Sequence, residues 1–202
     1  MSMTIPELHH ALRSLRLSGM IATLEARGGT LLIGQPGTGK SPCAKAIAQL
    51  AVQRGYRVFY REAHVLLQEI HEAREFGEVR KYRAQINSAE LMVIDDLFLR
   101  KLSANAGDEL ADLLMSRYER SSVVITSNRS VDDWGKLLGD VAVAAPLLDR
   151  IIHQGHLLKF EGKSWRMKEA AERLAKRAAT AQSTPVRRPQ VGDFDLATGG
   201  GF

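Results

Sequence analysis

The chain has 202 residues, of which 45% are hydrophobic and 25% are charged, a composition that suits one globular domain with a core. Its single cysteine, Cys43, excludes a framework of internal disulfides and fits a reducing compartment. No apolar run approaches membrane-spanning length and no signal-peptide pattern opens the chain, so we expect a cytoplasmic protein with no membrane partner. The net charge of +5 is compatible with a nucleic-acid partner but is weak support for one.

Residues 1–27 are expected to form a short helical arm. Pro6 can begin a helix. Basic residues then alternate with apolar residues that recur at roughly helical spacing. The apolar residues are Leu8, Leu12, Leu15, Met20 and Leu24. The arm leads directly into Gly28 and the first expected strand.

A glycine-rich segment after that strand is the most informative motif. Residues 30–33 form a short apolar run typical of a buried strand, and an Ala- and Gln-rich stretch over 43–54 predicts a helix. The segment between them fits G-x-x-x-x-G-K-[ST], the phosphate-binding P-loop: Gly34, Gln35, Pro36, Gly37, Thr38, Gly39, Lys40 and Ser41. In this context Lys40 is expected to reach the β- and γ-phosphates of a nucleotide, and the Ser41 hydroxyl to bind Mg²⁺. A Gly-rich turn with a chance lysine is the alternative.

Pro42 follows this motif directly. Proline has no backbone N–H to offer to a phosphate, and it biases the preceding residue, Ser41, away from helical geometry. Proline is nevertheless accepted in the first turn of a helix, where N–H groups have no intrahelical partner. We therefore expect the helix to form and one phosphate donor to be lost.

The next segments alternate between strand and helix. Residues 56–61 predict a strand. Residues 62–76 predict a helix that Gly77 ends, and residues 78–86 a short basic helix. Mixed charge on such a short helix is most often only a solvated face.

The next informative stretch is Glu90–Asp96, in which four apolar residues are followed by two carboxylates. A buried strand that delivers acid at its C-terminal edge is the Walker B pattern, and ligands bind at that edge of open parallel sheets. Asp95 is expected to hold Mg²⁺ through water, and Asp96 to orient or deprotonate the attacking water. A strand followed by an acidic turn is the alternative.

Polar residues also end the strand expected over 122–128, which follows a helix over 104–120. Asn128 stands where its side chain could touch the γ-phosphate or the attacking water. An asparagine that caps the following turn is the alternative.

Arg150 lies between apolar residues in a helix expected over 141–153, after a shorter one over 131–139. It is predicted either to pair with Asp149 or to reach the nucleotide of a neighbouring subunit as an arginine finger. His153 and His156, without further ligands, are a weak metal signal. The fifth strand is expected over 156–160.

The end of the chain changes character. A helix is expected over 162–180, with cations at Lys168, Arg173, Lys176 and Arg177 that could follow a phosphate backbone or simply stabilise a helix end. Residues 181–202 are rich in Gly, Pro, Ser and Thr and are expected to form a disordered tail after an ATPase core over 28–180.

Taken together, these motifs resemble the IstB-like transposition helper ATPases, which are relatives of the DnaC helicase loaders in the AAA+ class. The resemblance covers residues 12–168. Besides the P-loop, it rests on Leu15–Met20, Ser116–Ser121 with the strand that ends in Ser127-Asn128, Trp134-Gly135, Leu147–His153 and Gly162–Arg166.

The resemblance implies an α/β fold: a three-layer αβα P-loop NTPase with a mainly parallel five-stranded sheet and no separate lid domain. It implies Mg²⁺ and ATP as cofactors, with Lys40, Ser41, Asp95, Asp96 and Asn128 in the ATP site. It also makes Arg150 an inter-subunit arginine and gives Arg166 a possible role as a second sensor. The implied partners are double-stranded DNA, further copies of the chain assembled on it, and the transposase of the same mobile element.

This sequence departs from the family in two places. Family members carry a larger helical region between the Leu15–Met20 segment and the P-loop strand, and they lack a proline at position 42. Two further interpretations therefore stay open: an ATPase-inactive remnant or adaptor, and a DnaC-like helicase loader.

Overall fold

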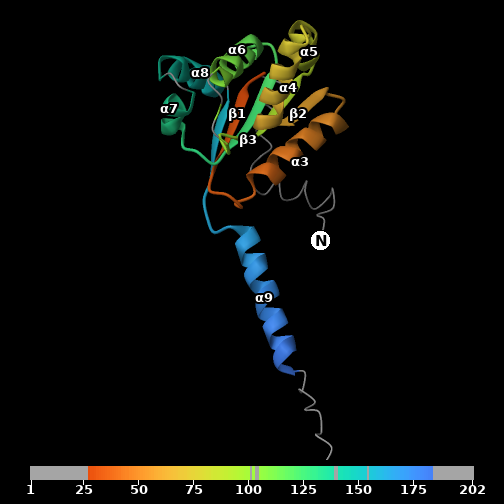
Figure 1. The fold of residues 1–202 in the computed structure, drawn as a ribbon, viewed down its shortest axis with the longest axis vertical. Helices are drawn as coiled ribbons and strands as arrows, with labels where there is room; N and C mark the ends of the chain where they lie inside the picture. The colour runs from red at the N-terminus through yellow and green to blue at the C-terminus, as the bar shows by residue number, and fades with distance from the viewer. Residues whose placement is uncertain (1–26, 101, 103–104, 139–140, 154, 184–202) are drawn as a thin grey trace, which may run out of the picture. The chain divides into compact units, whose positions relative to one another are not determined.

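Five parallel strands form the centre of the protein (Figure 1). The computed structural model describes residues 27–100, 102, 105–138, 141–153 and 155–183. The strands are β1 (Gly29–Gly34), β2 (Val58–Glu62), β3 (Leu91–Leu97), β4 (Ser122–Ser127) and β5 (His156–Phe160), in the spatial order β2-β3-β4-β1-β5. The expected mainly parallel five-stranded α/β fold is confirmed, with every described strand pair parallel.

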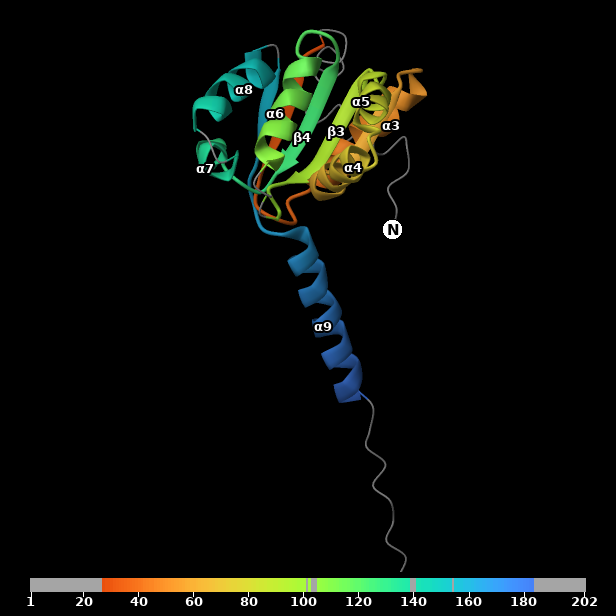
Figure 2. The ribbon, with the colours of Figure 1, turned by 45° about the horizontal axis from the view of Figure 1, so that its top comes forward.

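Helices cover both faces of this sheet (Figures 1 and 2). They are α3 (Lys40–Gln53), α4 (Ala63–Glu75), α5 (Val79–Asn87), α6 (Ala106–Arg117), the 3₁₀ turn η1 (Val131–Asp133), α7 (Trp134–Leu138) and α8 (Val141–His153). Helix α3 packs its alanines and Ile47 against one face of the sheet. Helices α4 to α8 pack on the other face, where the larger core cluster lies. Both faces of the sheet are therefore buried, which explains its continuous apolar strands.

The chain divides into two compact units between Trp165 and Arg166. Helix α9 (Trp165–Ser183) belongs almost wholly to the second unit and continues three residues into the stretch expected to be a tail. The helical arm expected over 1–27, except Arg27, and the tail from residue 184 onward lie outside the described residues. Within the described part, no helix is both long and apolar enough to cross a membrane.

The end of β3 and the turn after it have an unusual backbone conformation. Asp96 and Phe98 have positive φ angles of 54° and 63°, which residues other than glycine rarely adopt. The Phe98 ring packs edge-on against the fully buried Trp134, with ring centroids 5.1 Å apart. Ser127 Oγ donates a hydrogen bond to the Leu97 carbonyl at 2.9 Å. These contacts hold the residues that directly follow Asp96.

A buried arginine, Arg117, joins the C-terminal end of α6 to the C-terminal end of α5. Arg117 is 1% exposed and donates hydrogen bonds to the carbonyls of Ile86 and Ala89, at the C-terminal end of α5. Burial lowers the pKa of Arg117 to about 10, so the guanidinium stays charged at neutral pH. The partial negative charge of the helix end balances that cation.

Candidate functional site

The loop between β1 and α3 is shaped to present backbone N–H groups. Gly37 and Gly39 have φ angles of 80° and 100°, in the left-handed region that favours glycine, and Gly39 caps the N-terminus of α3. The first N–H groups of a helix have no intrahelical partner, and its N-terminus carries partial positive charge. The loop therefore has the geometry of an anion-binding site, for example for a phosphate group.

Gly37 is also required by its surroundings. A Cβ atom at this position would lie 2.0 Å from Ser164 Oγ. The Gly37 carbonyl accepts a hydrogen bond from the Trp165 N–H at 2.9 Å. The segment after β5 thus closes against the P-loop, a contact that the sequence analysis did not anticipate.

Lys40 lies inside the loop. Its side-chain ammonium donates hydrogen bonds to the carbonyls of Gly34 at 2.7 Å and Gln35 at 2.8 Å, and the residue is only 4% exposed. The loop therefore wraps around the cation. This places a buried positive charge where the motif requires one for a nucleotide phosphate.

Pro42 is accommodated within the first turn of α3. The helix begins at Lys40, three residues earlier than expected, and its first intrahelical hydrogen bond of this turn runs from the Cys43 N–H to the Gly39 carbonyl at 3.0 Å. Pro42 therefore removes only a donor that has no intrahelical partner. The expectation that the helix survives is confirmed, and Ser41 lies within α3 although it precedes a proline.

Replacing Pro42 by alanine is expected to strengthen the binding of Mg²⁺·ATP. The change restores one N–H beside the phosphate end and relaxes Ser41, and a hydrogen bond to a charged group contributes about 1.5–3 kcal/mol. Affinity should rise by roughly ten- to a hundredfold, with the larger gain when Mg²⁺ is present. Isothermal titration calorimetry with and without the metal measures this, and equal affinity in the two proteins would show that the loop compensates for the proline.

Asp95 and Asp96 have different surroundings. Asp95 lies near the C-terminal end of β3 and is 3% exposed. Asp96 follows at a break in the register between β3 and β4, and it borders a pocket of about 380 Å³ that α4 also lines. The Asp96 N–H donates hydrogen bonds to Thr126 Oγ1 at 2.8 Å and to Asp95 Oδ1 at 3.2 Å.

Two hydroxyl groups that the sequence analysis missed hold the Asp95 carboxylate. Thr126 Oγ1 of β4 donates a hydrogen bond to Asp95 Oδ1 at 2.5 Å, and the Tyr60 hydroxyl of β2 donates one to Asp95 Oδ2. Burial, followed by the hydrogen bond to Asp95, raises the pKa of Tyr60, so this hydroxyl remains a donor at neutral pH. Strand alternation, which puts Tyr60 and Thr126 on the same face as Asp95, was the available signal.

Asn128 follows β4 at the same edge of the sheet. Ser127 pairs with Ile33 of β1 and with Leu97 of β3, so the ends of these three strands lie side by side. Among the described residues the Asn128 side chain makes no hydrogen bond, and Ser127 Oγ instead accepts the N–H of Arg129 at 3.1 Å. The sheet thus brings the P-loop, Asp95, Asp96 and Asn128 to one edge.

The side chains at this edge fit a magnesium ion. Mg²⁺ prefers oxygen ligands and is commonly bound by one or two carboxylates together with substrate phosphates. The Ser41 hydroxyl and the Asp95 carboxylate supply oxygens of this kind. In the described part of the chain, no group of three or more His, Cys, Asp or Glu could hold a metal ion by itself, and this includes the neighbourhood of His153 and His156.

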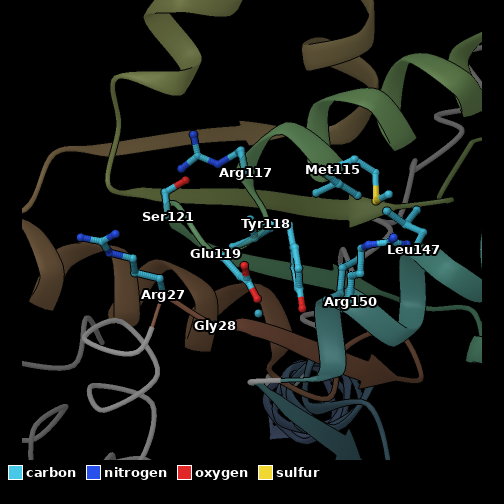
Figure 3. Close-up of a pocket in the computed structure, with 13 residues that line it drawn as sticks. Arg27, Gly28, Met115, Arg117, Tyr118, Glu119, Ser121, Leu147 and Arg150 are labelled. Atoms are coloured by element: carbon cyan, nitrogen blue, oxygen red, sulfur yellow. The ribbon is translucent and has the colours of Figure 1, made fainter.

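Arg150 lies beside the start of β1, at the end of the sheet opposite the P-loop, and Figure 3 shows it among the residues that line a pocket there. It lines a small pocket of about 30 Å³ with Gly28 and Gly29, where β1 begins. A strand rises about 3.3 Å per residue, so the six residues of β1 separate this pocket from the P-loop by roughly 17 Å. Arg150 therefore cannot reach the P-loop of its own subunit.

The contacts of Arg150 are with Tyr118 and its own helix. Its guanidinium lies 5.9 Å from the centre of the Tyr118 ring, and it donates a hydrogen bond to the Pro146 carbonyl at 3.3 Å. In Figure 3 the two side chains lie side by side. The ion pairs of the described residues do not include one between Arg150 and Asp149, so the structural pairing considered from the sequence is not formed here.

Two solved structures, one of DnaA with bound AMPPCP and one of a helicase loader, share this fold. AMPPCP-bound DnaA from Aquifex aeolicus matches with a TM-score of 0.61 and 25% sequence identity, covering 81% of this chain and 51% of that one. The DnaC helicase loader matches with a TM-score of 0.62 and 21% identity, covering 76% of this chain and 89% of that one. These likenesses support the AAA+ P-loop fold.

The amino-acid sequence gives the family. A putative ATP-binding protein of insertion sequence IS5376 from Geobacillus stearothermophilus is 30% identical over 149 residues, covering 74% of this chain and 59% of the relative. The corresponding protein of insertion sequence IS21 from Pseudomonas aeruginosa is 30% identical over 169 residues, covering 82% of this chain and 62% of the relative. This chain thus spans less than two thirds of the length of either relative. Residues 11–173 match the model of a family described as IstB-like ATP binding protein, and the chain belongs to that family.

Proposed function

We propose that this protein binds Mg²⁺·ATP and acts as a helper of DNA transposition, assembling with further copies of itself on double-stranded DNA and stimulating a transposase. One observation carries the proposal: in a chain of the IstB-like family, the sheet brings a P-loop, a buried Walker B carboxylate and Asn128 to the same edge. The names of its relatives, ATP-binding proteins of insertion sequences, support the link to transposition.

The proposed site assigns one task to each group. The loop from Gly34 to Ser41 holds the phosphates, and the Lys40 ammonium exchanges its carbonyl partners for phosphate oxygens. Ser41 and Asp95 would hold Mg²⁺, which would supply positive charge to offset that of the nucleotide phosphates. Asp96 and Asn128 orient the attacking water.

The position of Arg150 supports assembly into an oligomer. Arg150 lies at the end of the sheet opposite its own P-loop. Its guanidinium lies beside the Tyr118 ring and has no carboxylate partner among the described residues. A neighbouring subunit that docks against this end would receive the guanidinium in its own nucleotide site. Arg150 then acts as an arginine finger between subunits.

The direct test of the helper function is co-purification with the transposase encoded by the same mobile element. We expect the transposase to be retained when ATP and duplex DNA are present, and to be lost when Lys40 is replaced by alanine. Retention of a replicative helicase in place of the transposase would contradict the proposal in favour of a helicase loader.

Duplex DNA is expected to bind weakly, without sequence preference and with strong salt dependence. The net charge of +5 and the basic residues of α9 support a contact with the phosphate backbone. Neutralising about three phosphates would lower the affinity roughly 40-fold between 50 and 200 mM salt, because counterions are released on binding. Fluorescence anisotropy with a labelled duplex measures this slope.

A pair of substitutions locates the contact. Replacing Arg177 by glutamine should reduce the salt slope by about one phosphate contact. The matched control is Lys81→Gln on α5, whose side chain is highly exposed, and it should leave the slope unchanged. An affinity that does not depend on salt, or equal slopes in both variants, would contradict the role of α9.

A further inference from the structure

The Asp95 carboxylate is held from both neighbouring strands. Its strand, β3, lies between β2 and β4, and each neighbour supplies one hydroxyl donor. Tyr60 of β2 donates to Oδ2, while Thr126 of β4 donates to Oδ1 at 2.5 Å. With both oxygens engaged and only 3% of the residue exposed, the carboxylate is fixed in one orientation.

The hydroxyl of Tyr60 is directed to Asp95 by its own packing. Tyr60 pairs in register with Val93, two residues before Asp95 on the same face of the sheet. Its ring packs against the core cluster beneath α3, and the ammonium of Lys45, on the same helix as Lys40, lies 5.9 Å from the ring centre. Because the ring contacts both α3 and the sheet, its hydroxyl cannot easily turn away from the carboxylate.

We propose that Tyr60 is a positioning residue for Asp95 and sets how strongly Mg²⁺ contributes to nucleotide binding. This inference rests on the proposed ATP site. A carboxylate that holds a metal ion through water must keep one orientation, and the hydrogen-bond partners of such a group commonly change metal affinity or activity by about 10–100-fold when they are removed. Tyr60 lies at the far side of β3 from the P-loop strand, so it acts on the metal through Asp95.

The test is the Mg²⁺ dependence of nucleotide binding in Tyr60→Phe, measured by calorimetry with a non-hydrolysable ATP analogue in Mg²⁺ and in EDTA. Tyr60→Phe should bind the analogue in EDTA as the parent does. The gain in affinity on adding Mg²⁺ should fall by about tenfold or more.

Tyr56→Phe is the matched control. Tyr56 packs against the same cluster, and its hydroxyl makes no hydrogen bond among the described residues, so this variant should keep the full gain from Mg²⁺. Thr126 gives a second pair of variants for the other carboxylate oxygen. Thr126→Val should show the same selective loss, and Thr126→Ser, which keeps the hydroxyl, should not.

The outcomes separate this inference from the proposed function. If the parent binds no analogue in either condition, the proposed ATP site is wrong. If the parent binds the analogue but gains no affinity from Mg²⁺, the metal site at Asp95 and the role of Tyr60 are wrong, and the nucleotide site stands. If the parent shows the gain and Tyr60→Phe keeps it undiminished, only the role of Tyr60 is overturned. A larger gain in Tyr60→Phe also overturns it, since the hydroxyl would then compete with the metal for Asp95.

Discussion

Replacing Arg150 by alanine is expected to leave ATP binding intact and to lower ATP turnover by about 10³–10⁵-fold, the contribution typical of an arginine finger. The reason is geometric. The pocket that Arg150 lines lies at the start of β1, roughly 17 Å along that strand from the P-loop of the same subunit, so Arg150 can act only on a nucleotide held by a neighbour. Phosphate release and calorimetric binding, measured on the same preparation with duplex DNA present, separate the two effects.

Mixing Arg150→Ala and Lys40→Ala subunits tests directly whether Arg150 acts on the nucleotide of a neighbouring subunit. Arg150→Ala subunits keep a working P-loop, and Lys40→Ala subunits keep a working Arg150. Where a Lys40→Ala subunit supplies Arg150 to an Arg150→Ala neighbour, turnover should partly return, although neither variant is active alone. Loss of ATP binding in Arg150→Ala, or mixtures that stay inactive, would mean that Arg150 only supports the packing of α8 beside Tyr118.

Replacing Lys40 by alanine is expected to abolish measurable ATP binding. The ammonium is buried within the loop and would donate to both β- and γ-phosphate oxygens. Two hydrogen bonds to charged groups contribute about 3–6 kcal/mol, which corresponds to roughly a 10²–10⁴-fold loss of affinity. Calorimetry measures the loss.

The same side chain also holds the loop carbonyls of Gly34 and Gln35, so the fold of this variant must be checked. Thermal unfolding without nucleotide serves as the control. Loss of binding at an unchanged unfolding temperature assigns the effect to the phosphate contact. If the unfolding temperature of Lys40→Ala is lowered, the same titration is made with Lys40→Met, which keeps the length of the side chain.

The sequence predicted much of this fold because its strongest signals are local. The P-loop, the apolar strand before Asp95 and the strand before Asn128 each combine a short buried run with a polar end, and the parallel sheet brings those ends to one edge. The family resemblance was confirmed by the match over residues 11–173. The roles of individual site residues remain predictions.

The missed features depend on contacts between residues that are distant in the sequence. Tyr60 and Asp95 are 35 residues apart, and the closure of Ser164 on Gly37 joins segments at opposite ends of the core. The start of α3 at Lys40 was also missed, because the helix was predicted from the Ala- and Gln-rich stretch that begins at Cys43, whereas the N-cap at Gly39 sets where it begins. Periodicity and motif spacing report which face a residue occupies, but they do not report which hydroxyl reaches a given carboxylate.

A calorimetric titration of Mg²⁺·ATP into the intact protein, with Lys40→Ala measured beside it, tests most directly whether the P-loop of this chain binds the nucleotide. We expect saturable binding of one nucleotide per chain in the parent, weaker binding when EDTA removes the metal, and no measurable binding in folded Lys40→Ala. Equal binding in the parent and in Lys40→Ala, or no binding in the parent at nucleotide concentrations found in cells, would contradict the account.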